Sequence, residues 1–232
     1  MKKIFFIFFL LVSNISFSKS PSLPRNLLGV TFSPEYSYRF LSGSDTYSWL
    51  IDLRNEIENP KFGNTIGFKY SYRILNKFFI EGGALYSSKG YDTKKLDLIY
   101  NDPEPNAPVS LYKRYSYSFL EIPVCANYQL FDSCGFFISL GFIGNFPTRE
   151  RVSTFFQYAD GSETHDVSSG RSTTTNIFLS GIGGIGYFFR LSDKFYLKTE
   201  PFFKCSITPS ASDNVKDYFY SYGLEVGVYF GK

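Results

Sequence analysis

Apolar and polar residues alternate strictly along several long stretches of the chain, and this pattern constrains the fold most. From Leu28 to Phe40, one set of alternate positions is apolar or aromatic apart from Pro34, and the interleaved set is mostly small or charged. The same alternation recurs at 65–74, 120–130 and 220–230. A period of two is that of a β-strand whose two faces meet different surroundings. These strands are longer than the roughly 5–6 residues typical of soluble proteins.

The alternation predicts eight strands joined by connections of two alternating lengths. We expect the strands at 26–40, 63–75, 78–90, 113–130, 135–147, 173–190, 194–208 and 217–231. The connections after the second, fourth and sixth strands are tight, whereas the others are longer and polar, at 41–62, 91–112, 149–172 and 209–216. This order sends every long loop to one end, which is typical of outer-membrane barrels with short periplasmic turns and longer extracellular loops. A soluble β-sandwich has no reason to follow it.

The sequence therefore predicts an all-β fold, an eight-stranded antiparallel transmembrane β-barrel in the cell outer membrane. The aromatic content of 20% agrees with this, because Tyr and Phe are favoured at the two membrane interfaces of a barrel. We expect one aromatic girdle near the tight turns. We expect the second girdle, near the long loops, to contain Tyr36, Tyr38, Tyr86, Tyr117, Phe146, Phe178, Phe203 and Tyr220.

The first residues have the layout of a secretory signal peptide. Lys2 and Lys3 form a basic start, Ile4–Val12 is an unbroken apolar run, and the small residues Ser16 and Ser18 precede an expected cleavage before residue 19. The run is far shorter than the about 20 residues that a membrane-spanning helix needs. We therefore assign residues 1–18 to a signal peptide and residues 19–232 to the outer-membrane β-barrel domain.

Charge and cysteine content exclude several classes of protein. Two of the 24 Lys and Arg side chains lie in the expected signal peptide, and the rest nearly balance the 21 Asp and Glu side chains. A nearly neutral chain without a basic stripe argues against nucleic acid as a partner. Cys125, Cys134 and Cys205 are odd in number and lack metal-ligand spacing, so we expect no disulfide scaffold, although one pair can oxidise.

The alternation also predicts which charged side chains point into the barrel. They are Glu35, Arg39, Lys69, Arg73, Glu81, Glu121, Lys198, Glu200, Lys204 and Glu225. These charges can be interpreted as a conduction or catalytic path built on perturbed carboxylates. They can equally form a structural network in which each buried charge is neutralised by a neighbour. An eight-stranded barrel is narrow and filled by side chains, and the equal numbers of acids and bases favour the structural network.

The predicted loops carry few signs of chemistry. His165, the only histidine, stands beside Asp166, Ser168 and Ser169, a grouping that a barrel hydrolase would use. In a polar loop, however, nothing would hold a nucleophile rigidly. The segment Asp45–Asn59 has apolar residues at helical spacing and predicts a short helix over the mouth or on the membrane surface. No phosphate-binding or calcium-binding pattern is present, so we expect no catalytic residue, cofactor or metal.

Four strand segments carry a family resemblance, and they are Phe32–Arg39, Glu81–Tyr91, Ser118–Val124 and Tyr220–Tyr229. They resemble the PorT-like outer-membrane β-barrel domain family of Bacteroidota, and the resemblance covers most of the chain after the expected signal peptide. The resemblance implies the barrel fold and the outer-membrane location. It implies no enzymatic activity, and it suggests a link to protein secretion, the role with which PorT itself is associated.

We therefore expect a non-enzymatic barrel that is a structural or interaction component of the outer membrane and serves secretion or surface assembly. The expected partners are outer-membrane lipid and other envelope proteins that bind the extracellular loops. Two alternatives stay open at this point. One is a narrow channel for ions or small solutes, based on the charged interior, and the other is a lipid or peptide hydrolase, based on His165.

Overall fold

The computed structural model describes residues 23–101, 106–131, 135–170, 176–212 and 214–231. The predicted signal peptide, residues 1–18, lies outside the described residues. Eight long strands form the main body, β1 (Asn26–Gly43), β2 (Glu58–Leu75), β3 (Phe78–Thr93), β5 (Pro108–Gln129), β6 (Phe136–Tyr158), β8 (Phe178–Arg190), β9 (Phe195–Ser206) and β11 (Val215–Gly231). The short elements are η1 (Asp45–Tyr47), α2 (Ser48–Ile57), β4 (Leu96–Asp97), β7 (Glu163–Gly170) and β10 (Ala211–Ser212).

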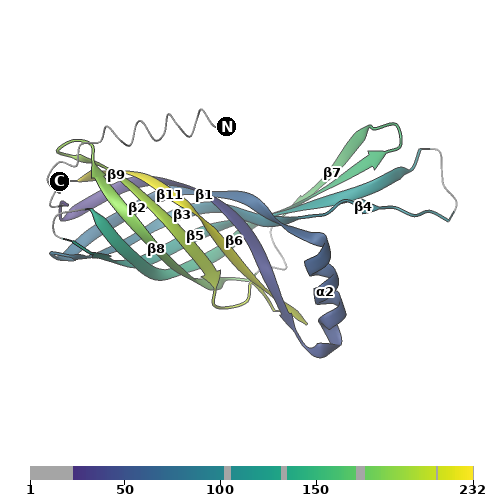
Figure 1. Cartoon of the computed structure of the whole chain (residues 1–232), viewed down its shortest axis with the longest axis horizontal. Helices are drawn as coiled ribbons and strands as arrows, with labels where there is room; N and C mark the ends of the chain where they lie inside the picture. Colours follow the sequence, from purple (N-terminus) through teal and green to yellow (C-terminus); the bar gives the residue numbers. More distant parts are fainter. Residues whose placement is uncertain (1–22, 102–105, 132–134, 171–175, 213, 232) are drawn as a thin grey trace.

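The eight long strands close into a barrel (Figure 1). Each strand pairs antiparallel with the next in the order β1-β2-β3-β5-β6-β8-β9-β11, and β11 pairs back onto β1 from Leu27–Gly231 to Gly43–Val215. Closure gives every strand of the ring a hydrogen-bonded neighbour on both sides, which a membrane interior requires because it offers the backbone no water. The predicted eight-stranded antiparallel barrel is confirmed.

Polarity is inverted relative to a soluble protein. Outward side chains on the barrel wall are apolar and exposed, such as Val124 at 58% and Leu140 at 65%, whereas the inward Glu121 and Lys198 are fully buried. An apolar outer surface over a polar interior is the arrangement of a barrel in lipid. No described helix is long and apolar enough to cross a membrane.

The two ends of the barrel differ as the loop lengths predict. The tight connections at residues 76–77 and 191–194 lie at the end where β11 finishes, and α2, β4 and β7 lie at the opposite end (Figure 1). Short turns mark the periplasmic end of such barrels, so α2 and β7 lie on the extracellular side. The helix predicted within Asp45–Asn59 is confirmed as η1 and α2.

All four predicted long loops are wrong in part, because strands extend into them, most of all into 91–112 and 149–172. β5 and β6 stay paired from Ser118–Arg149 out to Pro108–Tyr158, and β7 pairs with β6 over its whole length. A turn at Tyr158–Ser162, with Gly161 at φ 83°, connects β6 to β7. We call residues 96–97, 108–117 and 149–170 the extension, which projects beyond the barrel rim (Figure 1). Its polar sequence resembles a loop because neither of its faces touches the apolar interior of the membrane.

The predicted girdle near the long loops needs a correction. Tyr117 and Phe178 are 7% and 2% exposed and pack inside the barrel. Tyr36, Tyr86, Phe146, Phe203 and Tyr222 are exposed large side chains near that end. Tyr117 was placed by its height along the strand alone, whereas its odd number gives it the same inward direction as Glu121.

Candidate functional site: the lumen and the extracellular vestibule

Aromatic side chains fill both ends of the barrel interior. The lower aromatic layer, at the periplasmic end, consists of Leu23, Leu27, Phe79, Phe137, Phe188, Tyr196 and Tyr229. The upper aromatic layer, toward the extracellular end, consists of Tyr91, Tyr117, Phe119, Phe178 and Phe219. Most ring pairs within the layers meet edge-on or tilted, for example Phe119 on Phe178 with centroids 5.3 Å apart, whereas Phe178 stacks on Phe219. Both layers are buried and close the lumen above and below the charged residues.

The lower charge cluster lies next to the lower aromatic layer and contains Lys69, Glu81, Lys198, Glu200 and Glu225. The Lys198 ammonium lies 2.7 Å from Glu81, 2.7 Å from Glu200 and 3.1 Å from Glu225. Lys69 lies 3.0 Å from Glu81 and 2.7 Å from Glu225. The Tyr229 hydroxyl donates a hydrogen bond to the second Glu81 oxygen. The cluster thus joins strands from both halves of the chain.

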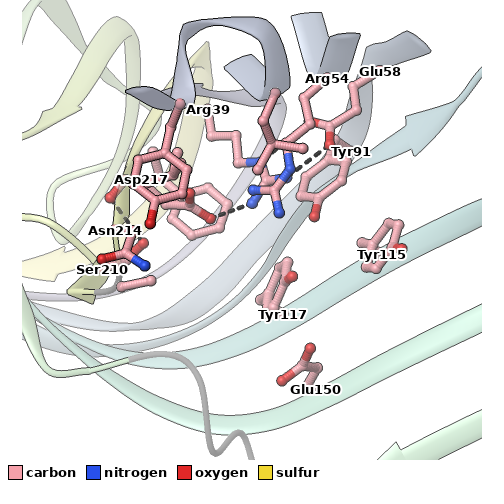
Figure 2. A pocket seen from close by; sticks show the side chains of 15 residues that line it. Arg39, Arg54, Glu58, Tyr91, Tyr115, Tyr117, Glu150, Ser210, Asn214 and Asp217 are labelled. Atoms are coloured by element: carbon pink, nitrogen blue, oxygen red, sulfur yellow. Dashed lines mark hydrogen bonds and ion pairs between the residues drawn. The ribbon is translucent and has the colours of Figure 1, made fainter. Parts of the chain in front are cut away.

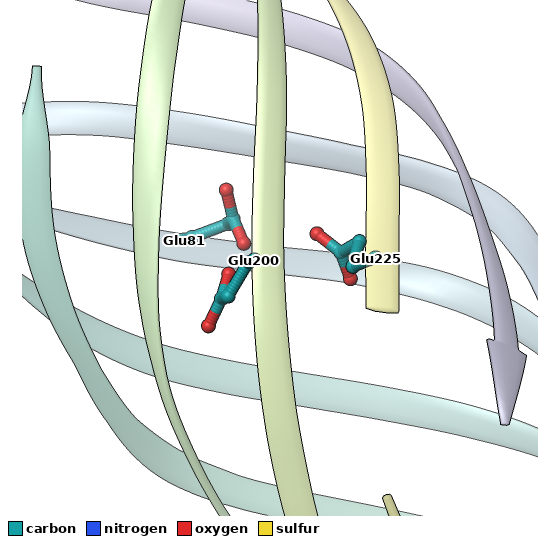
Figure 3. A group of neighbouring side chains, drawn as sticks. All are labelled: Glu81, Glu200 and Glu225. Atoms are coloured by element: carbon teal, nitrogen blue, oxygen red, sulfur yellow. The ribbon is translucent and has the colours of Figure 1, made fainter. Parts of the chain in front are cut away.

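The carboxylate of Glu81 on β3 meets those of Glu200 and Glu225, which are paired neighbours on β9 and β11, inside the lumen (Figure 3). One oxygen from each of Glu81, Glu200 and Glu225 lies within 4.8 Å of the others, a spacing that a metal ion can use. Lys198 makes an ion pair with each of the three, so its ammonium group supplies the positive charge that they share. The arrangement fits a structural ion-pair network better than a metal site.

The upper charge cluster lies one step closer to the extracellular end and contains Glu35, Lys89, Glu121 and Lys204. Glu121 pairs with Lys89 at 2.6 Å and with Lys204 at 3.2 Å, and Lys204 also reaches Glu35 at 3.2 Å. Thr65 and Ser221 donate hydrogen bonds to Glu35. Between the two clusters lies a small apolar group of Cys125, Ile143, Ile182 and Phe202. Cys125 and Cys205 are free thiols, and Cys134 lies outside the described residues.

The structure brings eight of the ten predicted inward charges into these two clusters, and the other two lie elsewhere. Arg39 is buried near the extracellular rim. Arg73 is only half-buried near the periplasmic end, and its Nη2 atom has no hydrogen-bond partner among the described residues. Arg73 is therefore not part of either network. It lies two residues from the end of β2, beyond the reach of the acids on neighbouring strands.

Sequence reasoning missed three charged members of the interior. Lys89 lies on the same inward face of β3 as Glu81, because the two are an even number of positions apart, so the alternation was sufficient to find it. Glu58 precedes the β-bulge between Pro60 and Asn64, and it was assigned to a loop. Asp217 lies near the start of the last strand, on its inward face. Both Glu58 and Asp217 form ion pairs with Arg39.

A vestibule of about 790 Å³ opens above the upper aromatic layer (Figure 2). Arg39 lies at its centre, where its guanidinium pairs with Glu58 at 2.7 Å and with Asp217. The same guanidinium lies over the Tyr91 ring at 3.9 Å from the centroid. Tyr115 and Glu150 contribute the facing wall. This group combines aromatic faces with fixed charges, which suits recognition of a small polar molecule or a polar side chain.

Helix α2 borders the vestibule at the extracellular rim. Leu50 and Arg54, one turn apart, line the cavity, whereas Trp49 and Leu53 are exposed at 64% and 45% on the other side of the helix. Arg54 makes no ion pair with any described residue. Its guanidinium is thus a cation at the vestibule wall that no acid in the described part of the chain neutralises.

His165 does not lie in a catalytic arrangement. It is in β7, where its ring stacks on Phe155 with centroids 5.7 Å apart. Asp166 and Ser168 have the opposite parity, so they point to the other face of the extension. Ser169 shares the face of His165 but accepts a hydrogen bond from Arg149. The geometry gives this histidine neither an orienting acid nor an adjacent nucleophile among these candidates.

The closed ring, its apolar outer wall and its charged interior define an outer-membrane β-barrel protein. The family described as "Outer membrane protein beta-barrel domain" matches residues 27–231, and the chain belongs to this family. Its location is the cell outer membrane. No curated protein matches the sequence.

Several solved barrels are similar to this chain at low sequence identity. Neisserial surface protein A is 14% identical, with 91% of this chain and 100% of that chain covered and a TM-score of 0.43. Ail, the attachment invasion locus protein of Yersinia pestis, is 12% identical, with 88% and 99% covered and a TM-score of 0.35. The outer membrane protease OmpT from Escherichia coli is 9% identical, with 92% and 98% covered and a TM-score of 0.40.

Proposed function

We propose that this protein is a non-enzymatic structural or interaction component of the outer membrane that serves secretion or surface assembly. The closed lumen carries this proposal. Both aromatic layers lie across the path that a solute would take, and the charges between them are bound to one another. A passing ion would have to displace buried ion pairs whose members cannot be left without partners at low cost. The interior thus supports stability rather than conduction.

The contact surface we assign to partners is the extracellular end. All eight residues of β7 in the extension are exposed, and the vestibule presents fixed charges and aromatic rings beside it. Functional contacts concentrate on such loops and rims because the barrel holds them in place. The resemblance to PorT-like barrels supports partners among other envelope proteins of a secretion or surface-assembly system.

The first test of the closed lumen is electrical. We expect purified protein in a planar lipid bilayer to give no conductance steps above the baseline, because the two aromatic layers exclude a continuous water path. Glu121→Ala is expected to give the same baseline, although it leaves Lys89 and Lys204 without their shared acid. Reproducible steps whose ion selectivity changes in Glu121→Ala would instead establish a channel.

The second test addresses the contact surface. A photo-reactive amino acid in place of Asp166, which is exposed on β7, is expected to form cross-links to other envelope proteins in intact cells. The matched control is the same amino acid at Asn76, which is exposed in a periplasmic turn. Cross-linked products of the same size from both positions, or none from Asp166, would contradict a partner at the extracellular end.

A further inference from the structure

Four basic side chains lie together on the outer face of the barrel where it continues into the extension. We call Lys61, Arg114, Arg149 and Arg151 the basic patch. The alternation of β5 runs from the lipid-facing Leu120 to Arg114 on the same face, and register pairs Arg149 with Ser118 and Arg151 with Ser116. Glu150, between the two arginines, instead lines the vestibule on the inner face.

The basic patch lies just above the apolar band. On β5 the outward residues are apolar from Tyr128 to Leu120, and they become Ser118 and Ser116 beyond it. At a rise of about 3.3 Å per residue and a tilt of about 40°, these two positions stand roughly 5 and 10 Å above Leu120. Arg149 and Arg151, their neighbours on β6, are therefore at the level of the lipid headgroups of the outer leaflet.

The patch has more positive charge than the protein around it neutralises. Arg114 pairs with Asp92 at 3.2 Å, with both side chains partly exposed. Arg149 donates a hydrogen bond to the Ser169 hydroxyl at 3.1 Å. Lys61 donates to the Ser116 hydroxyl and to the Tyr115 carbonyl.

Arg151 is exposed and makes no ion pair with any described residue. Within the patch, four cations thus face a single carboxylate, that of Asp92. The surface has a net positive charge that an anion on the outside can neutralise.

An aromatic row continues the same face further from the membrane. Tyr112 stacks on Phe155 with centroids 4.5 Å apart, and His165 stacks on the other side of Phe155. The Arg114 guanidinium lies 5.6 Å from the Phe155 centroid, so the basic patch and the aromatic row are continuous. The cations near the membrane, with the Tyr112 hydroxyl and the His165 ring nitrogens further out, match a ligand that has a phosphate and sugar hydroxyls at these two levels.

We propose that the basic patch binds the phosphate of a phosphorylated glycolipid in the outer leaflet. Arginine suits this role because its planar guanidinium binds two phosphate oxygens at once. The occupant is a membrane lipid rather than a soluble anion, since the patch is level with the headgroups and borders the acyl-facing wall. This site is separate from the vestibule, and it lies on the outer face of the extension that also carries the partner surface proposed above.

The test compares lipid retention by the full-length protein and two variants. Nanodiscs are prepared with phosphatidylcholine and either diphosphorylated or fully dephosphorylated lipid A, and retained lipid A is counted by native mass spectrometry. We expect wild type to prefer the phosphorylated form. Arg151→Gln should lower retention about five-fold, the effect of one surface cation on an anionic headgroup. Lys113→Gln removes the same charge from the opposite face of β5 and should leave retention unchanged.

Each outcome decides the proposal, provided that both variants migrate as folded protein in unboiled gels. Equal losses in Arg151→Gln and Lys113→Gln would mean that only overall charge matters, which overturns the site. Unchanged retention in Arg151→Gln, or equal retention of both lipid A forms by wild type, would do the same. Inorganic phosphate that displaces lipid A at an equal concentration would overturn the assignment to a lipid.

Discussion

Lys198→Met is expected to lower the free energy of unfolding by about 3 to 5 kcal/mol. Lys198 is fully buried and makes ion pairs with three glutamates. Without its ammonium, Glu81, Glu200 and Glu225 keep only Lys69 as a counter-charge, and at least one buried carboxylate loses its partner. Methionine fills a similar volume, so the loss comes from the charge rather than from a cavity. The measurement is urea unfolding in lipid vesicles.

The control for this variant is Lys194→Met, which removes the same charge a few residues earlier in an exposed periplasmic turn. We expect its unfolding midpoint to match that of wild type. If Lys198→Met were as stable as Lys194→Met, the lower charge cluster would have to be hydrated. The structural interpretation of the interior charges would then be wrong.

Gly186→Val and Phe137→Ala are expected to be severely destabilising alone and less so together. A Cβ atom at Gly186 would overlap the Phe137 ring, so the wall of β8 has room for this ring only because residue 186 has no side chain. Overpacking at Gly186 should cost about 1 to 3 kcal/mol. Removal of the buried ring in Phe137→Ala should cost about 3 to 5 kcal/mol.

The double variant tests whether the two positions act on one space. Valine at 186 fills part of the cavity that Phe137→Ala leaves, so the double variant should be more stable than the sum of the single effects predicts, by at least about 1 kcal/mol. Strict additivity in urea unfolding would show that Gly186 and Phe137 do not compete. The close packing of the lower aromatic layer would then not hold in the membrane.

The barrel could be predicted from the sequence because lipid and a polar interior impose opposite requirements on neighbouring residues. Leu120 and Glu121 illustrate this, since one is exposed to lipid and the next is fully buried. The alternation of inward and outward residues also placed Lys198 and Glu200 inside. It does not predict which charges meet, because this depends on strand order and stagger around the ring. The contact of Lys69 with Glu225, 156 residues apart, could not be found from the sequence.

Prediction failed beyond the lipid-facing wall, where neighbouring residues no longer have to alternate between apolar and polar. Beyond Ser118 both faces of β5 and β6 are outside the apolar interior of the membrane, so the extension was assigned to loops. Glu58 and Asp217 were missed for the same reason, since the vestibule that they line with Arg39 lies above the apolar band. The resemblance to PorT-like barrels rests on strand segments, and therefore carries little information about this region.

The charge clusters also constrain how the ring can close. Strand β1 meets β11 only when the two ends of the sheet come together, and there Ser221 donates a hydrogen bond to Glu35 while Lys69 of the adjoining β2 reaches Glu225. A slip of two residues along this junction would keep apolar side chains outward but move both acids away from their partners. The buried charges thus discriminate between alignments that the lipid-facing surface would accept equally. They act as a check on assembly, since only the native alignment gives every acid a partner.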